Sequence, residues 1–213
     1  MKDNIEIVKA RAEKLFIDAR GSHDWDHTLR VGRLCERIGH VEGADMKTLL
    51  IAAYLHDIGR SCQDASNGAV CHAEKGAMMA QPIIKDLPFS KKQKENIIHC
   101  IKAHRFRGNN APKSIEAKVL FDADKLDAIG AIGVARAYLF AGELGARLHS
   151  PEINVEEAKS YSKDDTGYRE FKVKLNKIQN KILTGEGRKI AKERHSFMEA
   201  FFKRFLEEYD GIR

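Results

Sequence analysis

Apolar residues recur at steps of three and four through most of the 213-residue chain, whereas strict alternation of apolar and polar residues is hardly found. The sequence therefore predicts an all-α fold. The helices are expected over residues 3–20, 24–41, 45–58, 73–86, 90–105, 114–127, 128–147, 167–183 and 186–209. Several breaks carry the residues that end or cap helices, namely Gly43 with Asp45, Ser90, and Ser114 after Pro112.

Two segments have no helical apolar stripe and are expected to be loops. The first, RSCQDASNGAVCH, follows Ile58-Gly59 and covers residues 60–72, and the second covers residues 149–167 and contains Pro151. Loops of this length inside a helical domain are commonly functional or mobile.

The length of the chain suits one substantial hydrophobic core. We expect a helical core over residues 1–150 and C-terminal helices over 151–213 that pack on it as one structural unit. The last helix has an apolar face formed by Phe197, Phe201, Phe202, Phe205 and Leu206. This face is expected to pack on the core, with a homodimer interface as the alternative.

The composition narrows the class of ligand. Lys and Arg number 37 against 31 Asp and Glu, and this modest positive charge suits an anionic small molecule. Only 8% of residues are aromatic and no long basic run occurs, which disfavours a nucleic-acid partner. The four cysteines lack metal or disulfide spacing, and neither a signal peptide nor an apolar stretch of membrane-spanning length is visible. We therefore expect a cytoplasmic protein with reduced thiols and no membrane partner.

The stretch YLHDIGR places His56 and Asp57 directly after the apolar run Leu49–Leu55. Burying two such groups without partners costs several kcal/mol, so they are expected either to be hydrogen-bonded or to hold a cation. A helix that ends here, as Gly59 suggests, would let both side chains turn toward one ion.

Other histidines and carboxylates also stand at the polar ends of apolar helices. They occur in SHDWDHTLRV, CHAEKGA, IIHCIKAHRFRG and LFDADKLDAIG. Imidazole nitrogens and carboxylate oxygens that converge from several helices are the donors that divalent metal ions require. The sequence therefore predicts a divalent metal site inside a helical bundle.

The motifs SHDWDHTLRV, YLHDIGR, CHAEKGA and DADKLDAIGAIGVAR, in this order over about residues 20–140, resemble the HD superfamily of metal-dependent phosphohydrolases. The small stand-alone bacterial HD-domain hydrolases are the most similar subgroup, and the tail TGEGRKIAKERHSFMEAF is also similar to theirs. The resemblance implies a compact HD-domain helical bundle with a C-terminal helical extension. It also implies one divalent ion, Mn, Mg, Ni, Co, Zn or Fe, and leaves a second ion open.

Carried over by position, the resemblance assigns the metal ligands to His27, His56, Asp57 and Asp124. Asp124 is preferred to Asp122 because the family places its last ligand in an A-D-[KR]-L context, which here is ADKL.

In two-metal members of the superfamily, extra histidines hold the second ion. His72, His104 and His23 could do so here, or they could line the phosphate pocket of a site with one ion. Ala103 stands where such members carry the first of two adjacent histidines. The number of ions therefore stays open.

Glu74 is the candidate general base, with Asp57 as second choice. The alternative is that Glu74 only complements the positive end of its helix. The candidates for binding phosphate are the cationic side chains near these motifs, Lys75, Lys125, Arg105, Arg107 and Arg60.

The resemblance implies a phosphorylated small-molecule substrate, and a nucleotide is favoured. Nucleoside triphosphate pyrophosphohydrolysis is the preferred reaction, with nucleotidase or cyclic-nucleotide phosphodiesterase activity as alternatives. Two further alternatives are a non-catalytic HD module that binds metal or nucleotide and an HD-fold oxygenase with two irons.

Overall fold

The computed structural model describes residues 4–16, 24–66, 68–105 and 110–213, and over these ranges the chain contains helices and no strand. The all-α class is therefore confirmed. The elements are α1 (Asn4–Glu13), η1 (Lys14–Phe16), α2 (Trp25–Glu42), α3 (Met46–Leu55), α4 (Arg60–Ala65), α5 (His72–Ile84), α6 (Lys91–Ala103), α7 (Ile115–Asp127), α8 (Gly130–Glu143), α9 (Gly167–Val173), η3 (Leu175–Lys181) and α10 (Gly185–Tyr209).

These elements form two compact units. The first unit consists of Met1–Asp124 with Leu183–Glu186, and the second consists of Lys125–Ile182 with Gly187–Arg213. The four residues expected as metal ligands all belong to the first unit.

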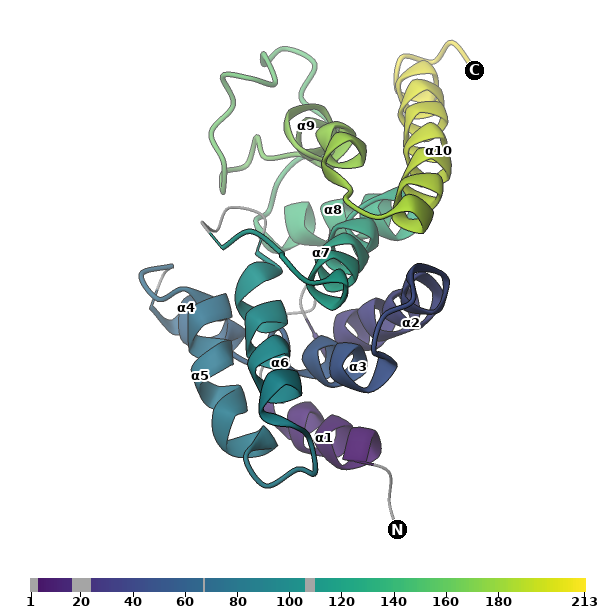
Figure 1. Ribbon diagram of the computed structural model, residues 1–213. Coiled ribbons are helices and arrows are strands. Elements are labelled where there is room, and N and C mark those ends of the chain that lie inside the picture. The colour runs from purple at the N-terminus through teal and green to yellow at the C-terminus, as the bar shows by residue number, and fades with distance from the viewer. Residues whose placement is uncertain (1–3, 17–23, 67, 106–109) are drawn as a thin grey trace. The chain divides into compact units, whose positions relative to one another are not determined.

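Helix α3 is the centre of the first unit. Every residue from Thr48 to Leu55 is buried, because the run LLIAAYL is apolar on all sides of the helix and not along one stripe. Helices α1, α2 and α6 pack around α3, and α5 packs on α6 (Figure 1). The enclosed helix is a rigid support that ends directly before His56.

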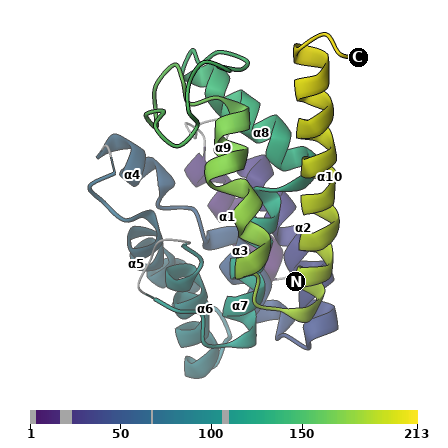
Figure 2. The ribbon, with the colours of Figure 1, turned by 90° about the horizontal axis from the view of Figure 1, so that it is seen from above.

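In the second unit, α8, α9 and α10 lie beside one another (Figure 2). Aromatic rings from these three helices form its core. The rings of Phe171 and Phe202 stack with centroids 4.4 Å apart. Phe202 is buried within this unit, whereas Phe197 on the same helix is 46% exposed. A homodimer formed through the exposed part of this face stays a prediction.

The expectation that residues 60–72 are a loop is wrong for their first half. Arg60–Ala65 form helix α4. Its sequence has no apolar stripe, and none of its residues is buried. Polar contacts made in the folded chain hold this helix: Arg60 donates to Asp57, and the Gln63 side chain accepts from His72.

Other helix boundaries differ by a few residues from those expected. The helix expected to begin at 128 begins at Gly130. The positive φ of Gly130, +78°, changes the direction of the chain between α7 and α8. The helix expected over 167–183 divides at Lys174 into α9 and the 3-10 helix η3. The first expected helix ends at Glu13 and continues as η1 to Phe16, and residues 17–20 lie outside the described residues.

The predicted caps are confirmed. Gly43 ends α2 in the left-handed conformation with φ +71°, and Asp45 caps α3 by accepting the amides of Lys47 and Thr48. Ser90 forms a reciprocal capping box with Gln93 at the start of α6. These residues place the helix ends where the sequence predicts them.

A polar network joins the starts of α3, α6 and α7. The two carboxylate oxygens of Glu116 accept the backbone N–H of Asp45 at 2.9 Å and the amide of Asn96 at 2.8 Å. The side chain of Gln93 donates to Asp45 at 2.9 Å. Burial by itself raises the pKa of Glu116, but the hydrogen bonds from Asp45 and Asn96 bring this pKa below its usual range.

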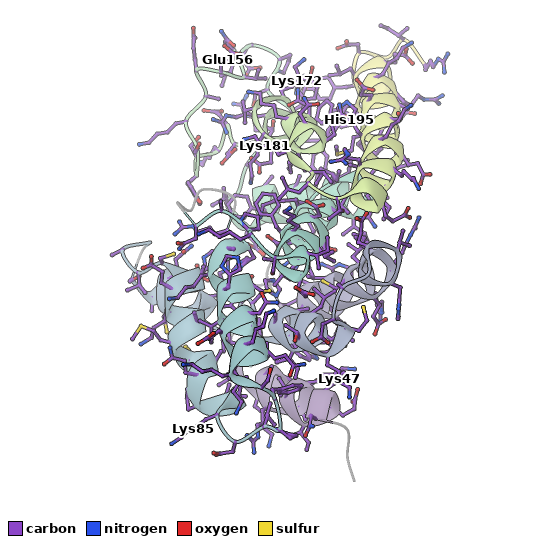
Figure 3. The ribbon with its side chains drawn as sticks, viewed as in Figure 1. Lys47, Lys85, Glu156, Lys172, Lys181 and His195 are labelled. Atoms are coloured by element: carbon purple, nitrogen blue, oxygen red, sulfur yellow. The ribbon has the colours of Figure 1, made fainter. Side chains whose placement is uncertain are left out.

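Charged side chains lie at the periphery of each unit. Figure 3 shows Lys47 and Lys85 on the first unit and Glu156, Lys172 and Lys181 on the second, and all five are exposed. The four cysteines are free. No helix in the described part of the chain is both long enough and apolar enough to cross a membrane.

We expect Glu116→Ala to lower the free energy of unfolding at neutral pH by about 1–3 kcal/mol, because two donors lose their charged acceptor. The folded pKa of Glu116 is lowered, so its contribution is present above the unfolded carboxyl pKa and is lost as the pH falls through the folded pKa. Urea denaturation at several pH values should therefore show the deficit shrinking in acid. Glu95→Ala, which removes an exposed carboxylate from α6, should stay within about 0.5 kcal/mol of the parent. An equal deficit at all pH values would contradict this account.

Candidate metal centre

His27 enters the interior from the first turn of α2. Asp24 caps this helix, and its carboxylate accepts the backbone N–H of His27 at 3.0 Å. His27 is 1% exposed, whereas Asp26 beside it is exposed. The cap therefore fixes the helix start that turns His27 inward.

His56 and Asp57 lie in the turn that follows α3. His56 is the C-terminal cap of α3, and Asp57 accepts the backbone N–H of Arg60 at 2.9 Å through its own carbonyl. Because α3 ends at Leu55, the side chains of His56 and Asp57 can turn toward the same donor group, and both are at most 1% exposed. The pair thus stands at a helix end, as the sequence predicts.

Gly59 acts differently from a left-handed helix cap. Its φ is −88°, and it is the N-terminal cap of α4. A Cβ at Gly59 would lie 2.4 Å from the carbonyl oxygen of His72 and 2.6 Å from the amide nitrogen of Gly76. Glycine is therefore needed because the turn that carries Asp57 lies against the backbone of α5.

The other donors also stand near helix ends. His72 is the first residue of α5, His104 is the C-terminal cap of α6, and Asp124 lies in the last turn of α7. His72 and His104 are buried, and the Asp124 side chain is 17% exposed.

Two groups of donors share the carboxylate of Asp57. In the first group, Asp57 Oδ2 lies 3.9 Å from the Nε2 atoms of both His27 and His56. Asp124 Oδ1 lies 3.4 Å from the same Nε2 of His27. The structure therefore brings together all four residues that the resemblance assigns as metal ligands.

The second group lies on the other oxygen of Asp57. Asp57 Oδ1 is 3.4 Å from the Nε2 atoms of both His72 and His104, and these two nitrogens are 3.1 Å apart. Ligands at about 2.0–2.2 Å from one ion are separated from each other by roughly 3–4 Å. Both groups have the spacing of a divalent metal site.

Backbone carbonyls orient two of the imidazoles. His56 Nδ1 lies 2.7 Å from the carbonyl oxygen of Ala53, and His104 Nδ1 lies 2.6 Å from that of Ile101. Each Nδ1 therefore carries the proton and donates it, which leaves the Nε2 lone pair for a metal ion. The fully buried Nε2 of His56 has no hydrogen-bond partner among the described residues, as expected for a ligand atom.

Gln63 orients the third imidazole. Its Oε1 lies 2.8 Å from His72 Nδ1 and also accepts the backbone N–H of His72 at 3.3 Å. Sequence reasoning missed this residue, because Gln63 lies in the segment expected to be a loop and no motif marks it. The acceptor set and its fixed tautomers fit a divalent cation.

Asp57 is a buried anion stabilised by surrounding cationic and polar groups. Burial by itself raises its pKa, but the adjacent Arg60 guanidinium is the main group that holds this pKa well below its usual range. Arg60 donates to both carboxylate oxygens, at 3.0 Å and 3.2 Å from one terminal nitrogen. Asp57 is therefore ionised at neutral pH.

His56 and His72 are neutral at the same pH. Burial lowers the pKa of His56 to about 4 and that of His72 to about 3, and the nearby Asp57 only partly opposes this effect. Neutral imidazoles and an ionised carboxylate are the forms that bind metal ions.

Of the remaining candidates, three lie on the helices that carry His72 and Asp124, and two lie outside the described residues. Glu74 is exposed in the first turn of α5, Lys75 is half-buried one residue further, and Lys125 is buried. Their roles as general base and phosphate ligands stay predictions. His23 and Arg107 lie outside the described residues.

Arg105 has a partner of its own. Its guanidinium donates to the Sγ of Cys71 at 2.9 Å, directly before His72 in the chain. Its predicted contact with phosphate also stays a prediction.

His99 accepts the backbone N–H of Lys113 at 3.0 Å, which agrees with a structural role.

Comparison with known proteins places this geometry in a family. Residues 24–129 match the model of the HD domain. The chain is 32% identical to the uncharacterized protein YpgQ of Bacillus subtilis over 97% of this chain and 94% of that protein. The chain belongs to the HD superfamily.

Solved structures share its fold along nearly the whole chain. The crystal structure of an HD-superfamily hydrolase from Bacillus thuringiensis superposes with a TM-score of 0.76 and 28% identity, covering 97% of this chain and 96% of that one. The structure of Bacillus subtilis YpgQ in complex with ADP gives a TM-score of 0.71 and 29% identity, covering 96% and 94%. The resemblance seen in the motifs is thereby confirmed.

We expect Asp57→Asn to lower the affinity of this HD domain for Mn²⁺ by more than about 100-fold, because even outer-shell partners of metal ligands contribute 10- to 100-fold. Titration calorimetry measures the affinity, and the far-ultraviolet circular dichroism spectrum should remain helical. Asp26→Asn removes an exposed carboxylate beside His27 and is the matched control, with parental affinity. Parental affinity in Asp57→Asn would contradict the assignment of Asp57 as a ligand.

Proposed function

We propose that the protein is a metal-dependent phosphohydrolase that acts on a nucleotide, with nucleoside triphosphate pyrophosphohydrolysis as the preferred reaction. The observation that carries this proposal is the buried carboxylate of Asp57, whose two oxygens face two pairs of imidazole Nε2 atoms at 3.4–3.9 Å. The membership of the chain in the HD superfamily supports hydrolysis, and the ADP complex of YpgQ supports a nucleotide as ligand.

The residues that would hold the first ion are His27, His56, Asp57 and Asp124. When bound, a divalent cation supplies Lewis-acid chemistry, since it polarises a phosphoryl oxygen and makes water more acidic. The second group, Asp57 with His72 and His104, either holds a further ion or lines the phosphate pocket. The three convergent acceptor atoms at 3.1–3.4 Å favour a further ion.

The substrate is proposed to approach at the side of Asp124 and Arg60. Each of these side chains is 17% exposed, whereas Asp57 is 1% exposed. The Arg60 guanidinium is always charged and carries several N–H donors in a fixed fork. It can therefore bind phosphoryl oxygens while it also donates to Asp57. Arg60 would thus hold the substrate phosphate next to the ionised carboxylate.

Water must be directed at phosphorus for hydrolysis, and Glu74 is the proposed base. It is exposed and near the start of the helix that carries His72, so it can take up a proton without losing a buried partner. Asp57 is the second choice.

A cytoplasmic location is likewise a proposal, which the free thiols support.

A second candidate function is a di-iron oxygenase. Asp57 and the five donor side chains grouped around it also suit a pair of irons. Metal content separates this candidate from the hydrolase.

The test combines metal analysis with product analysis. Protein purified without chelators is examined by elemental mass spectrometry, and phosphate and pyrophosphate release is measured on a nucleotide panel with Mn²⁺, Mg²⁺, Co²⁺ or Ni²⁺. We expect nucleoside triphosphate and water to give nucleoside monophosphate and pyrophosphate. Phosphate as the product would instead indicate a nucleotidase or related phosphatase.

Two variants on α2 provide a matched comparison for this assay. His27→Ala should abolish release because it removes a ligand, whereas His40→Ala, which changes an exposed histidine of the same helix, should leave release unchanged. Two irons per chain without release of phosphate or pyrophosphate would replace the hydrolase by the oxygenase. No release with any nucleotide and any metal would overturn the proposal.

A further inference from the structure

A short strap far along the chain is fixed to the helix that carries Asp124. The strap consists of residues 183–186 and belongs to the first unit. The carboxylate of Asp122 on α7 accepts the backbone N–H groups of Leu183 at 2.9 Å and Thr184 at 2.7 Å. It also accepts the hydroxyl of Thr184 at 2.6 Å.

Asp122 is fully buried, and both of its carboxylate oxygens accept hydrogen bonds from the strap. The side chains of residues two positions apart on an α-helix differ in direction by about 200°. Asp122 and Asp124 therefore point to opposite sides of α7. Asp122 therefore bonds α7 to the strap on one side, while on the other side Asp124 Oδ1 lies 3.4 Å from His27 Nε2. This also explains why the first aspartate of DADKLD is not a member of the ligand group.

The strap is fixed to α2 as well. The backbone N–H of Glu186 donates to the carboxylate of Glu42 at 2.7 Å, and the Glu186 carboxylate accepts the guanidinium of Arg37 at 3.0 Å. Both partners lie in the C-terminal half of α2, the helix that carries His27. Four residues of chain thus connect the two helices whose ligands His27 and Asp124 must meet.

We propose that Asp122 and the strap are a positioning device that completes the metal site by holding Asp124 toward His27. Asp124 is more exposed than the other candidate ligands, so packing encloses it least. The HD-domain match ends at residue 129, and the strap lies well beyond it. The site therefore depends on a segment outside the matched domain. This inference rests on the metal site of the proposed function.

The test measures Mn²⁺ affinity by electron paramagnetic resonance of free and bound Mn²⁺, at a temperature well below unfolding. Asp122→Asn places amide hydrogens against the N–H groups of the strap, and it should weaken binding about 10- to 100-fold. Thr184→Val keeps the shape of the side chain and removes only the hydroxyl. It should weaken binding by a smaller factor and lose most of its effect in the Asp122→Asn background.

A purely structural role gives a different result. Ile97→Val removes one buried methyl group from α6, a helix that carries neither Asp122 nor the strap, and should lower Tm while leaving Mn²⁺ affinity unchanged. If Asp122→Asn and Thr184→Val also lower only Tm, the positioning role is overturned and the metal site stands. If Asp122→Asn does not fold, Thr184→Val decides by the same criterion. If the parent protein binds no Mn²⁺, the metal site itself is overturned, and with it the inference.

Discussion

The site depends on a single buried negative charge, the carboxylate of Asp57. A carboxylate that is 1% exposed is strongly destabilising unless cations and hydrogen-bond donors surround it. Here Arg60 donates to both oxygens, and two pairs of imidazoles face them from either side. Since one carboxylate serves both groups, the segments that carry those imidazoles must all end at the same place.

Placement at helix ends makes this convergence possible. His56 and His104 each cap a helix, and each donates its Nδ1 proton to a carbonyl three residues earlier, that of Ala53 or Ile101. The ring is then fixed by its own helix, and its Nε2 points away from that helix. Because α3 is enclosed by other helices, the donor atoms are held in position before any ligand arrives, which is what efficient binding of a cation requires.

The sequence predicted features that depend on local patterns. Helical periodicity predicted the all-α class, and Asp45, Ser90 and Gly43 marked helix ends correctly because capping is local chemistry. The order of the motifs predicted the HD superfamily. The proposed ligand set comes from this resemblance, and its four residues lie together in the structure.

The features that the sequence did not predict depend on contacts between distant residues. Helix α4 has no apolar stripe, and Gln63 is recognisable only once His72 lies beside it. Gly59 is required by the approach of α5, and no turn motif could have shown this. Likewise, the sequence did not show that Asp122 binds the strap, because Leu183 and Thr184 lie more than fifty residues away along the chain.

The central claim, that Asp57 and its neighbours form a divalent metal centre, is tested most directly by anomalous diffraction from crystals grown with Mn²⁺. The account predicts an anomalous peak bounded by His27, His56, Asp57 and Asp124, at about 2.0–2.2 Å from their donor atoms. A further peak beside His72 and His104 would establish the form with two ions. Density for Mn²⁺ only at exposed carboxylates, or none at all at saturating Mn²⁺, would contradict the claim.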